Sequence, residues 1–134
     1  MRELSGDECR QRLMKRAFVG RLAFVDAGAP MVLPVNYLAD EHTVTFCTSS
    51  GRTLKAIQSG ERVAFEIDDI RPLHHTGWSV VVTGTAREVT EPADLELLKR
   101  GPLKSWAVGS DAVWIRIAID SISGRELDQP EDED

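Results

Sequence analysis

The sequence lacks any long apolar run. Nowhere do about 18 apolar residues follow one another, the length that a bilayer-spanning helix requires, so we expect no membrane segment. The opening residues, Met1–Ser5, lead into charged sequence without the apolar core of a signal peptide. Both absences favour a globular, cytoplasmic protein.

Cysteine and histidine are also scarce. Cys9 and Cys47 lie far apart, and the three histidines, His42, His74 and His75, share no metal-ligand spacing with them. We therefore predict reduced thiols, as a reducing compartment favours, and no metal site. Neither His74 nor His75 has a nucleophile at a fixed spacing, so the pair is interpreted as loop residues and no catalytic residue is assigned.

Positive charge is in deficit. The chain has 16 Lys and Arg residues against 22 Asp and Glu residues, a formal net charge of −6. It offers no concentrated basic face for a phosphate backbone, so nucleic acid is not an expected partner. Part of the negative charge lies in 128–134, which we predict to be an acidic, disordered tail.

What the sequence does contain is a series of short alternating apolar segments. Its 134 residues, without an internal repeat or a long linker, predict a single domain over 1–127. Strands are predicted at 20–25, 31–38, 43–48, 62–68, 77–89 and 112–119. Short helices are predicted at 5–17, 52–59 and 92–100. This pattern predicts a mainly β protein whose six strands form a closed or nearly closed antiparallel barrel.

Local signals refine this picture. Ser5 and Glu8 are spaced as a capping box at the start of the first helix. Pro34 cannot donate a ladder hydrogen bond, so it belongs at an edge, a bulge or a break of its strand. Gly84, inside the fifth strand, predicts a bulge or a sharp bend. Arg21 is interpreted as solvent-facing, with an interface salt bridge as the alternative.

The segment 46–55 runs from a strand through a hydroxyl-rich, glycine-containing loop into the start of a helix. Backbone N–H groups at a helix N-terminus attract anions, and the helix dipole adds to this attraction. Side chains that suit a phosphate monoester are Thr48, Ser49, Ser50, Arg52, Thr53 and Lys55. The alternative is ordinary helix capping by Ser50 beside solvated basic residues.

Several segments together carry a resemblance to a known family. They are Val19–Phe24, Val32–Tyr37, Phe46–Thr48, Val63–Asp68, Gly77–Val80 and Gly84–Arg87. In their order and spacing, from Leu4 to about Leu127, the chain resembles the flavin-binding split-barrel family related to pyridoxamine 5′-phosphate oxidase. It is most similar to the small actinobacterial-type and nitroimidazole-reductase-like members.

The resemblance implies a six-stranded antiparallel split β-barrel with flavin mononucleotide (FMN) at a homodimer interface. The implied cofactor contacts are Leu33, Pro34, Val35 and Asn36 along the isoalloxazine ring, Thr48, Ser49, Ser50, Arg52, Thr53 and Lys55 at the ribityl phosphate, and Trp78 and Trp114 beside the ring. Large aromatic residues also serve as core or interface residues, which is the alternative for both tryptophans. The implied function is a flavin-dependent oxidoreductase of unspecified substrate.

Two positions depart from the family pattern. Members commonly carry basic residues two and three positions after the loop glycine, where this chain has Thr53 and Leu54. Arg52 and Lys55 flank these positions, although their side chains leave a helix at different angles. Relatives of this barrel bind a deazaflavin, haem or no cofactor, so a non-catalytic carrier and a cofactor-free structural dimer are the alternatives.

Overall fold

The computed structural model describes residues 1–15, 19–49, 51–101 and 112–127, so Ser50 and the predicted tail lie outside the described residues. The strands are β1 (Arg2–Glu3), β2 (Val19–Asp26), β3 (Ala29–Ala39), β4 (Thr43–Thr48), β5 (Arg62–Arg71), β6 (Thr76–Glu88) and β7 (Val113–Leu127). The helices are α1 (Gly6–Lys15), α2 (Gly51–Gln58) and α3 (Pro92–Arg100), with a 3₁₀ turn at Pro72–His74.

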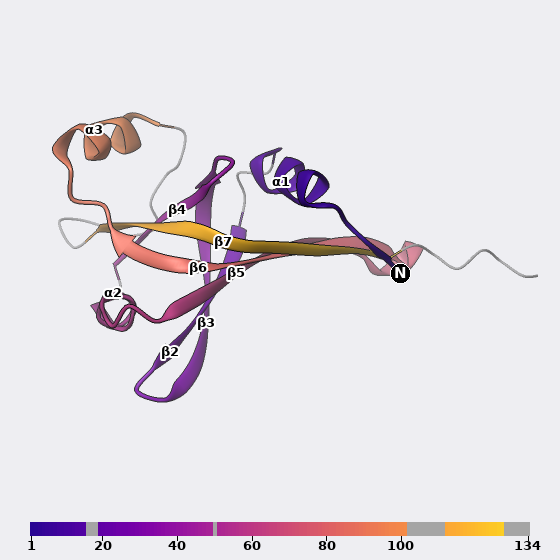
Figure 1. Cartoon of the computed structure of the whole chain (residues 1–134), viewed down its shortest axis with the longest axis horizontal. Helices are drawn as coiled ribbons and strands as arrows, with labels where there is room; N and C mark the ends of the chain where they lie inside the picture. Colours follow the sequence, from indigo (N-terminus) through magenta and orange to yellow (C-terminus); the bar gives the residue numbers. More distant parts are fainter. Residues whose placement is uncertain (16–18, 50, 102–111, 128–134) are drawn as a thin grey trace, which may run out of the picture.

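The strands form one antiparallel sheet that closes on itself. Its order is β1-β7-β4-β3-β2-β5-β6, and β6 also pairs with β7, so that β2 to β7 make a six-stranded ring. The predicted six-stranded antiparallel barrel is thereby confirmed, and β1 adds two residues beside β7 that the sequence pattern did not predict. Figure 1 shows the β2–β3 hairpin projecting below the long β5–β6–β7 ribbon.

Two strands, β5 and β7, continue three or more residues beyond their predicted ends. β7 continues to Leu127 instead of ending at Ile119, because its second half pairs with β6. That half is rich in serine, glycine and charged residues, so it lacks the apolar period-two pattern by which strands are recognised. β5 likewise runs to Arg71, into a segment that we expected to be a loop.

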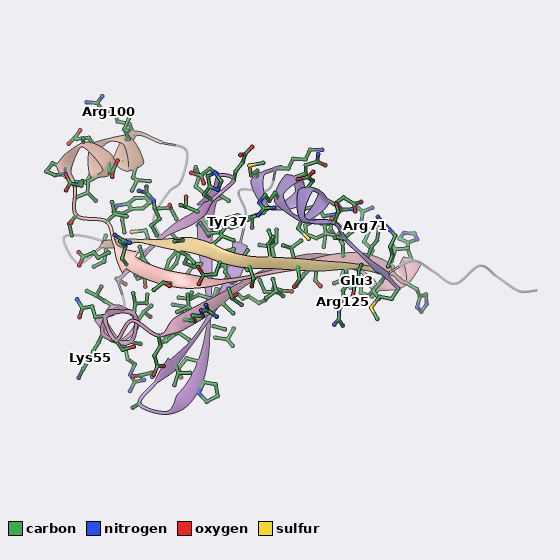
Figure 2. All side chains as sticks on the ribbon, in the orientation of Figure 1. Glu3, Tyr37, Lys55, Arg71, Arg100 and Arg125 are labelled. Carbon is green, nitrogen blue, oxygen red and sulfur yellow. The ribbon has the colours of Figure 1, made fainter. Side chains whose placement is uncertain are left out.

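Side chains fill the interior of the barrel. Tyr37, Phe46 and Phe65 are almost completely buried, and the rings of Tyr37 and Phe65 meet edge to face with centroids 5.0 Å apart. The Tyr37 hydroxyl donates to the Leu13 carbonyl oxygen at 3.1 Å, which attaches α1 to the barrel; Figure 2 shows Tyr37 beside α1. Because aromatic and aliphatic side chains occupy this space, a bulky ligand has to bind outside it.

Helix α1 begins with the predicted capping box. The Glu8 N–H donates to Ser5 Oγ at 3.1 Å, and the Ser5 N–H donates to Glu8 Oε1 at 2.9 Å. Its buried residues, Cys9 and Leu13, belong to the barrel core, and the helix lies across β7. The described part of α1 reaches Lys15, and the predicted end at 17 lies outside the described residues.

Gly84 lies where β6 bends around the barrel. The register between β6 and β7 shifts between Thr83 and Gly84, which confirms the predicted irregularity. A Cβ atom at position 84 would lie 1.9 Å from the carbonyl oxygen of Ala118, which belongs to the backbone of β7. The close approach of the two strands therefore depends on glycine.

We expect Gly84→Ala to lower the free energy of unfolding by about 3 kcal/mol, because the added methyl group forces the backbones of β6 and β7 apart. Urea unfolding followed by tryptophan fluorescence measures the change. Gly51→Ala is the matched control, since a Cβ atom there would meet nothing within 4 Å. Equal unfolding midpoints for the two variants would contradict the close approach at Gly84.

Candidate functional site

The candidate site lies where β3 and β4 separate. The ladder between these strands ends at the pair Tyr37↔Phe46. The residues of β3 that precede Tyr37 pair with β2 and, among the described register pairs, not with β4. β4 instead continues beside β7 as far as Thr48 and then leads into α2. We call this place the β3–β4 fork, with Leu33–Asn36 as its β3 arm and Thr48–Lys55 as its α2 arm.

The β3 arm carries four of the predicted flavin contacts. Val35 points into the core and is buried, whereas Leu33, which packs against the same core, is partly exposed. Pro34 is exposed on the outer face, and Asn36 is partly buried and engaged in an interaction.

Pro34 does not interrupt its strand. β3 runs without a break from Ala29 to Ala39, and Pro34 is the register partner of Arg21 on β2. The interpretation of Pro34 as a strand break is therefore wrong, because the strand conformation accommodates the fixed backbone angle of proline. Its position outside the β3–β4 ladder agrees with the edge alternative.

The α2 arm separates buried hydroxyl groups from exposed cations. Thr48 and Thr53 are buried, and both are engaged in interactions. Ser49, Arg52 and Lys55 are exposed, and Figure 2 shows Lys55 directed away from the barrel. Among the described residues, the segment leading into and starting α2 therefore presents two basic groups and one hydroxyl group to the solvent.

Thr53 stands at one of the positions where a basic residue is common in the family that the sequence resembles. Its side chain is only 1% exposed, and with Ile57 it forms the face of α2 that packs on the barrel. An unpaired ammonium group at that depth would carry a large desolvation cost. Threonine suits this packing, and the positive charge of the arm comes from Arg52 and Lys55 instead.

Arg52 is restrained by one ion pair. Its Nε atom lies 3.1 Å from Asp26 Oδ2 at the end of β2, and its side chain is 72% exposed. An ion pair so exposed contributes about 0–1 kcal/mol, so an anion could displace Asp26 at little cost. Sequence reasoning missed Asp26 as a site residue, because only the folded chain brings α2 beside β2.

The two predicted tryptophan contacts lie far apart. Trp114 on β7 is the register partner of Cys47 and is buried against α3. Trp78 is the partner of Glu126 near the other end of β7, and the guanidinium of Arg12 lies 5.6 Å from its ring centroid. From Trp114 to Glu126 the strand measures roughly 40 Å. One chain therefore cannot bring both rings to the same ligand.

A pair of carboxyl groups lies beside the β3 arm on the outer face of the barrel. Arg21 is the register partner of both Pro34 and Glu66, and its Nη1 atom lies 3.0 Å from Glu66 Oε1 and 3.0 Å from Asp68 Oδ2. Burial and the neighbouring Asp68 carboxyl raise the pKa of Glu66 to about 7. Arg21 is half exposed, as predicted, but it forms ion pairs with both carboxyl groups, and Glu66 keeps its proton up to near-neutral pH.

Other chemistry is sparse in the part of the chain that the structure describes. In those ranges no group of three or more His, Cys, Asp or Glu side chains is arranged to hold a metal ion. Cys9 and Cys47 are both buried thiols, and His74 and His75 are exposed at the turn between β5 and β6. None of the described helices has the length and apolar character needed to cross a bilayer.

Comparison with protein families identifies the barrel. The family model described as pyridoxamine 5′-phosphate oxidase matches residues 5–126. The chain belongs to this family. Another relative is the uncharacterized protein Rv0080 of Mycobacterium tuberculosis, which is 38% identical over 103 residues, covering 73% of this chain and 67% of that protein.

Two solved structures resemble this family member along nearly its whole length. The FAD binding protein from Mycobacterium smegmatis is 32% identical, with a TM-score of 0.77 over 96% of this chain and 99% of that chain. An FAD-binding protein from Mesorhizobium loti is 28% identical, with a TM-score of 0.76 over 94% of this chain and 97% of that chain. Both have the strand arrangement that the resemblance predicted.

Glu66 should make the stability of the protein depend on pH between about 4.5 and about 7. Its pKa is higher in the folded than in the unfolded chain, so the native state binds an extra proton in this window and loses stability as the pH rises. Glu66→Gln should flatten this part of the curve of melting temperature against pH. Glu61→Gln, which removes an exposed carboxyl group outside the cluster, should keep the wild-type slope. A slope unchanged in Glu66→Gln would contradict the raised pKa of Glu66.

Proposed function

We propose that this family member binds a flavin, FMN, at the β3–β4 fork and uses it as an oxidoreductase, working as a homodimer. The fork itself carries the proposal: β3 and β4 part after Tyr37↔Phe46, and the exposed cations Arg52 and Lys55 stand on the α2 arm. Membership of the pyridoxamine 5′-phosphate oxidase family and the FAD-binding relatives support a flavin.

The residues of the fork suit a flavin phosphate. Arg52 and Lys55 supply positive charge, Ser49 supplies an exposed hydroxyl group, and the backbone N–H groups at the start of α2 favour an anion. On the β3 arm, backbone groups lie outside the β3–β4 ladder and suit the polar edge of an isoalloxazine ring. The weak ion pair between Arg52 and Asp26 keeps one guanidinium close to this position before a phosphate arrives.

A bound flavin supplies the redox chemistry, while the protein binds it and orients it. This division of tasks suits a chain to which the sequence assigns no nucleophile. In the proposed arrangement the α2 arm holds the phosphate, and the β3 arm positions the ring. The packed core beneath both arms, including Val35 and Ile57, keeps their separation fixed.

In a homodimer, the second copy would cover a cofactor that the packed barrel interior cannot hold. Since Phe46 and Phe65 occupy the interior, the ring has to lie on the surface, where solvent would reach it in a single chain. The outer face of β2 and β3 carries Val25 and Val32, whose side chains are exposed close to the β3 arm. A second copy packed on this face would bury them and cover the ring.

Light scattering is expected to give twice the chain mass of 14.8 kDa. Val32→Asp should shift the protein toward monomers, because it places a charge on the apolar surface that the second copy would bury. Thr85→Asp, at an exposed position of β6, is the control and should stay dimeric. A wild-type monomer at micromolar concentration would contradict the dimer.

The purified protein is expected to be yellow, with the absorption bands of an oxidised flavin. Chromatography of the heat-released cofactor distinguishes FMN from FAD, and FAD would replace the finer assignment. Bleaching of these bands by reduced nicotinamide favours an oxidoreductase over a non-catalytic carrier. A Soret band would indicate haem. A colourless protein that gains no thermal stability from excess FMN, FAD or deazaflavin would contradict flavin binding. The cofactor-free structural dimer would then be the remaining alternative.

Arg52→Ala combined with Lys55→Ala should raise the Kd for FMN at least about tenfold, since a hydrogen bond to a charged group contributes about 1.5–3 kcal/mol. Quenching of flavin fluorescence measures the Kd. Riboflavin, which lacks the phosphate, should bind the wild type and the double variant equally. Lys99→Ala, at an exposed lysine on α3, is the control. Unchanged FMN affinity in the double variant would contradict the phosphate assignment.

A further inference from the structure

A hollow lies outside the fork, where the first turn of α3 stands over the outer face of β6 and β7. Its volume is about 400 Å³, which is in the range of small-molecule sites. The lining residues that carry charge are Arg87, Glu88, Glu91, Asp94 and Arg116. We call this place the α3 hollow; it contains no residue of either arm of the fork.

The floor of the α3 hollow is a row of outward side chains on neighbouring strands. Arg87 on β6 is the register partner of Arg116 on β7, which is the partner of Thr45 on β4. The Arg116 Nε atom donates to Thr45 Oγ1 at 3.1 Å, so its guanidinium is held against the sheet. In the next row Ala118 lies beside Thr43, and these small side chains leave depth above them.

Among the described residues, the two arginines of the floor share a single long ion pair, between Arg116 and Asp94. Like charges directly opposite each other are unfavourable in a sheet. Asp94 Oδ2 lies 3.7 Å from Arg116 Nη1, beyond ordinary hydrogen-bond length, and among the described residues Arg87 makes no ion pair. An oxyanion placed between the two guanidinium groups would relieve the repulsion and accept hydrogen bonds from both.

The wall of the α3 hollow has the opposite charge. Glu88 at the end of β6, Glu91 before α3 and Asp94 in the first turn of α3 line it, so three carboxyl groups face two guanidinium groups. Such a wall opposes a simple anion and attracts an ammonium group. A ligand that carries both charges satisfies the floor and the wall together.

We propose that the α3 hollow binds a small zwitterion of about the size of an amino acid. Its carboxylate or phosphate lies between Arg87 and Arg116, and its ammonium group faces Glu88, Glu91 and Asp94. Binding here involves no residue of the fork, so it stands or falls independently of the flavin.

The test is an NMR titration of the ¹⁵N-labelled full chain with glycine and with O-phosphoethanolamine. Acetate and methylammonium, each carrying one of the two charges, are the comparison probes. We expect at least one zwitterion to bind about tenfold more tightly than either comparison probe. The amide shifts should cluster at Val89, Thr90 and Ala118, which line the hollow.

Arg87→Gln is the diagnostic variant, because Arg87 is exposed and its loss breaks no ion pair among the described residues. It should weaken zwitterion binding about tenfold without lowering the melting temperature. Arg100→Gln, which removes an exposed guanidinium at the far end of α3, should leave the affinity unchanged. Acetate binding as tightly as the zwitterions, shifts located elsewhere, or full affinity in Arg87→Gln would each overturn the proposal.

Discussion

The ladder between β6 and β7 closes the row of strands into a ring, and the remaining features depend on that closure. It extends from Gly77↔Leu127 to Glu88↔Ile115 and bends at Gly84, where β6 passes close to the carbonyl group of Ala118. With the ring closed, the inward side chains form one packed core, and the wall opens where β3 and β4 part. The same ladder sets Arg87 opposite Arg116, so both candidate binding sites follow from the closure of the barrel.

Much of the fold could be predicted from the sequence, because most of its strands have one face in the core. Alternation of apolar and polar residues identified β2, β5 and the first half of β7, and the capping box identified the start of α1. The second half of β7 was not predicted, because Ser121 and Ser123 do not contribute to an alternating apolar pattern. Its strand conformation comes from pairing with β6, which is tertiary information.

The candidate site was predictable in its segments but not in its contacts. The hydroxyl-rich loop and its basic residues pointed to the start of α2, yet the burial of Thr53 depends on how α2 lies on the barrel. Likewise, Asp26 beside Arg52, and Arg21 between two carboxyl groups, become visible only once strands and helices are in register. The residue types within one segment can be read from the sequence, whereas their contacts with distant segments depend on how strands and helices pack.

The two faces of each barrel strand are under different constraints, since one packs in the core and the other contacts solvent or a ligand. In β2, for example, Leu22 and Phe24 are buried, while Arg21 and Val25, on either side of this pair in the chain, are exposed. Substitutions at the inward positions change the packing of the core and therefore the stability of the fold. Substitutions at the outward positions change the contacts with molecules that bind to the surface. Evolution can therefore revise the ligands of such a barrel at every second residue and leave its architecture intact. Relatives at 28–32% identity that keep TM-scores of 0.76–0.77 are what such a separation produces.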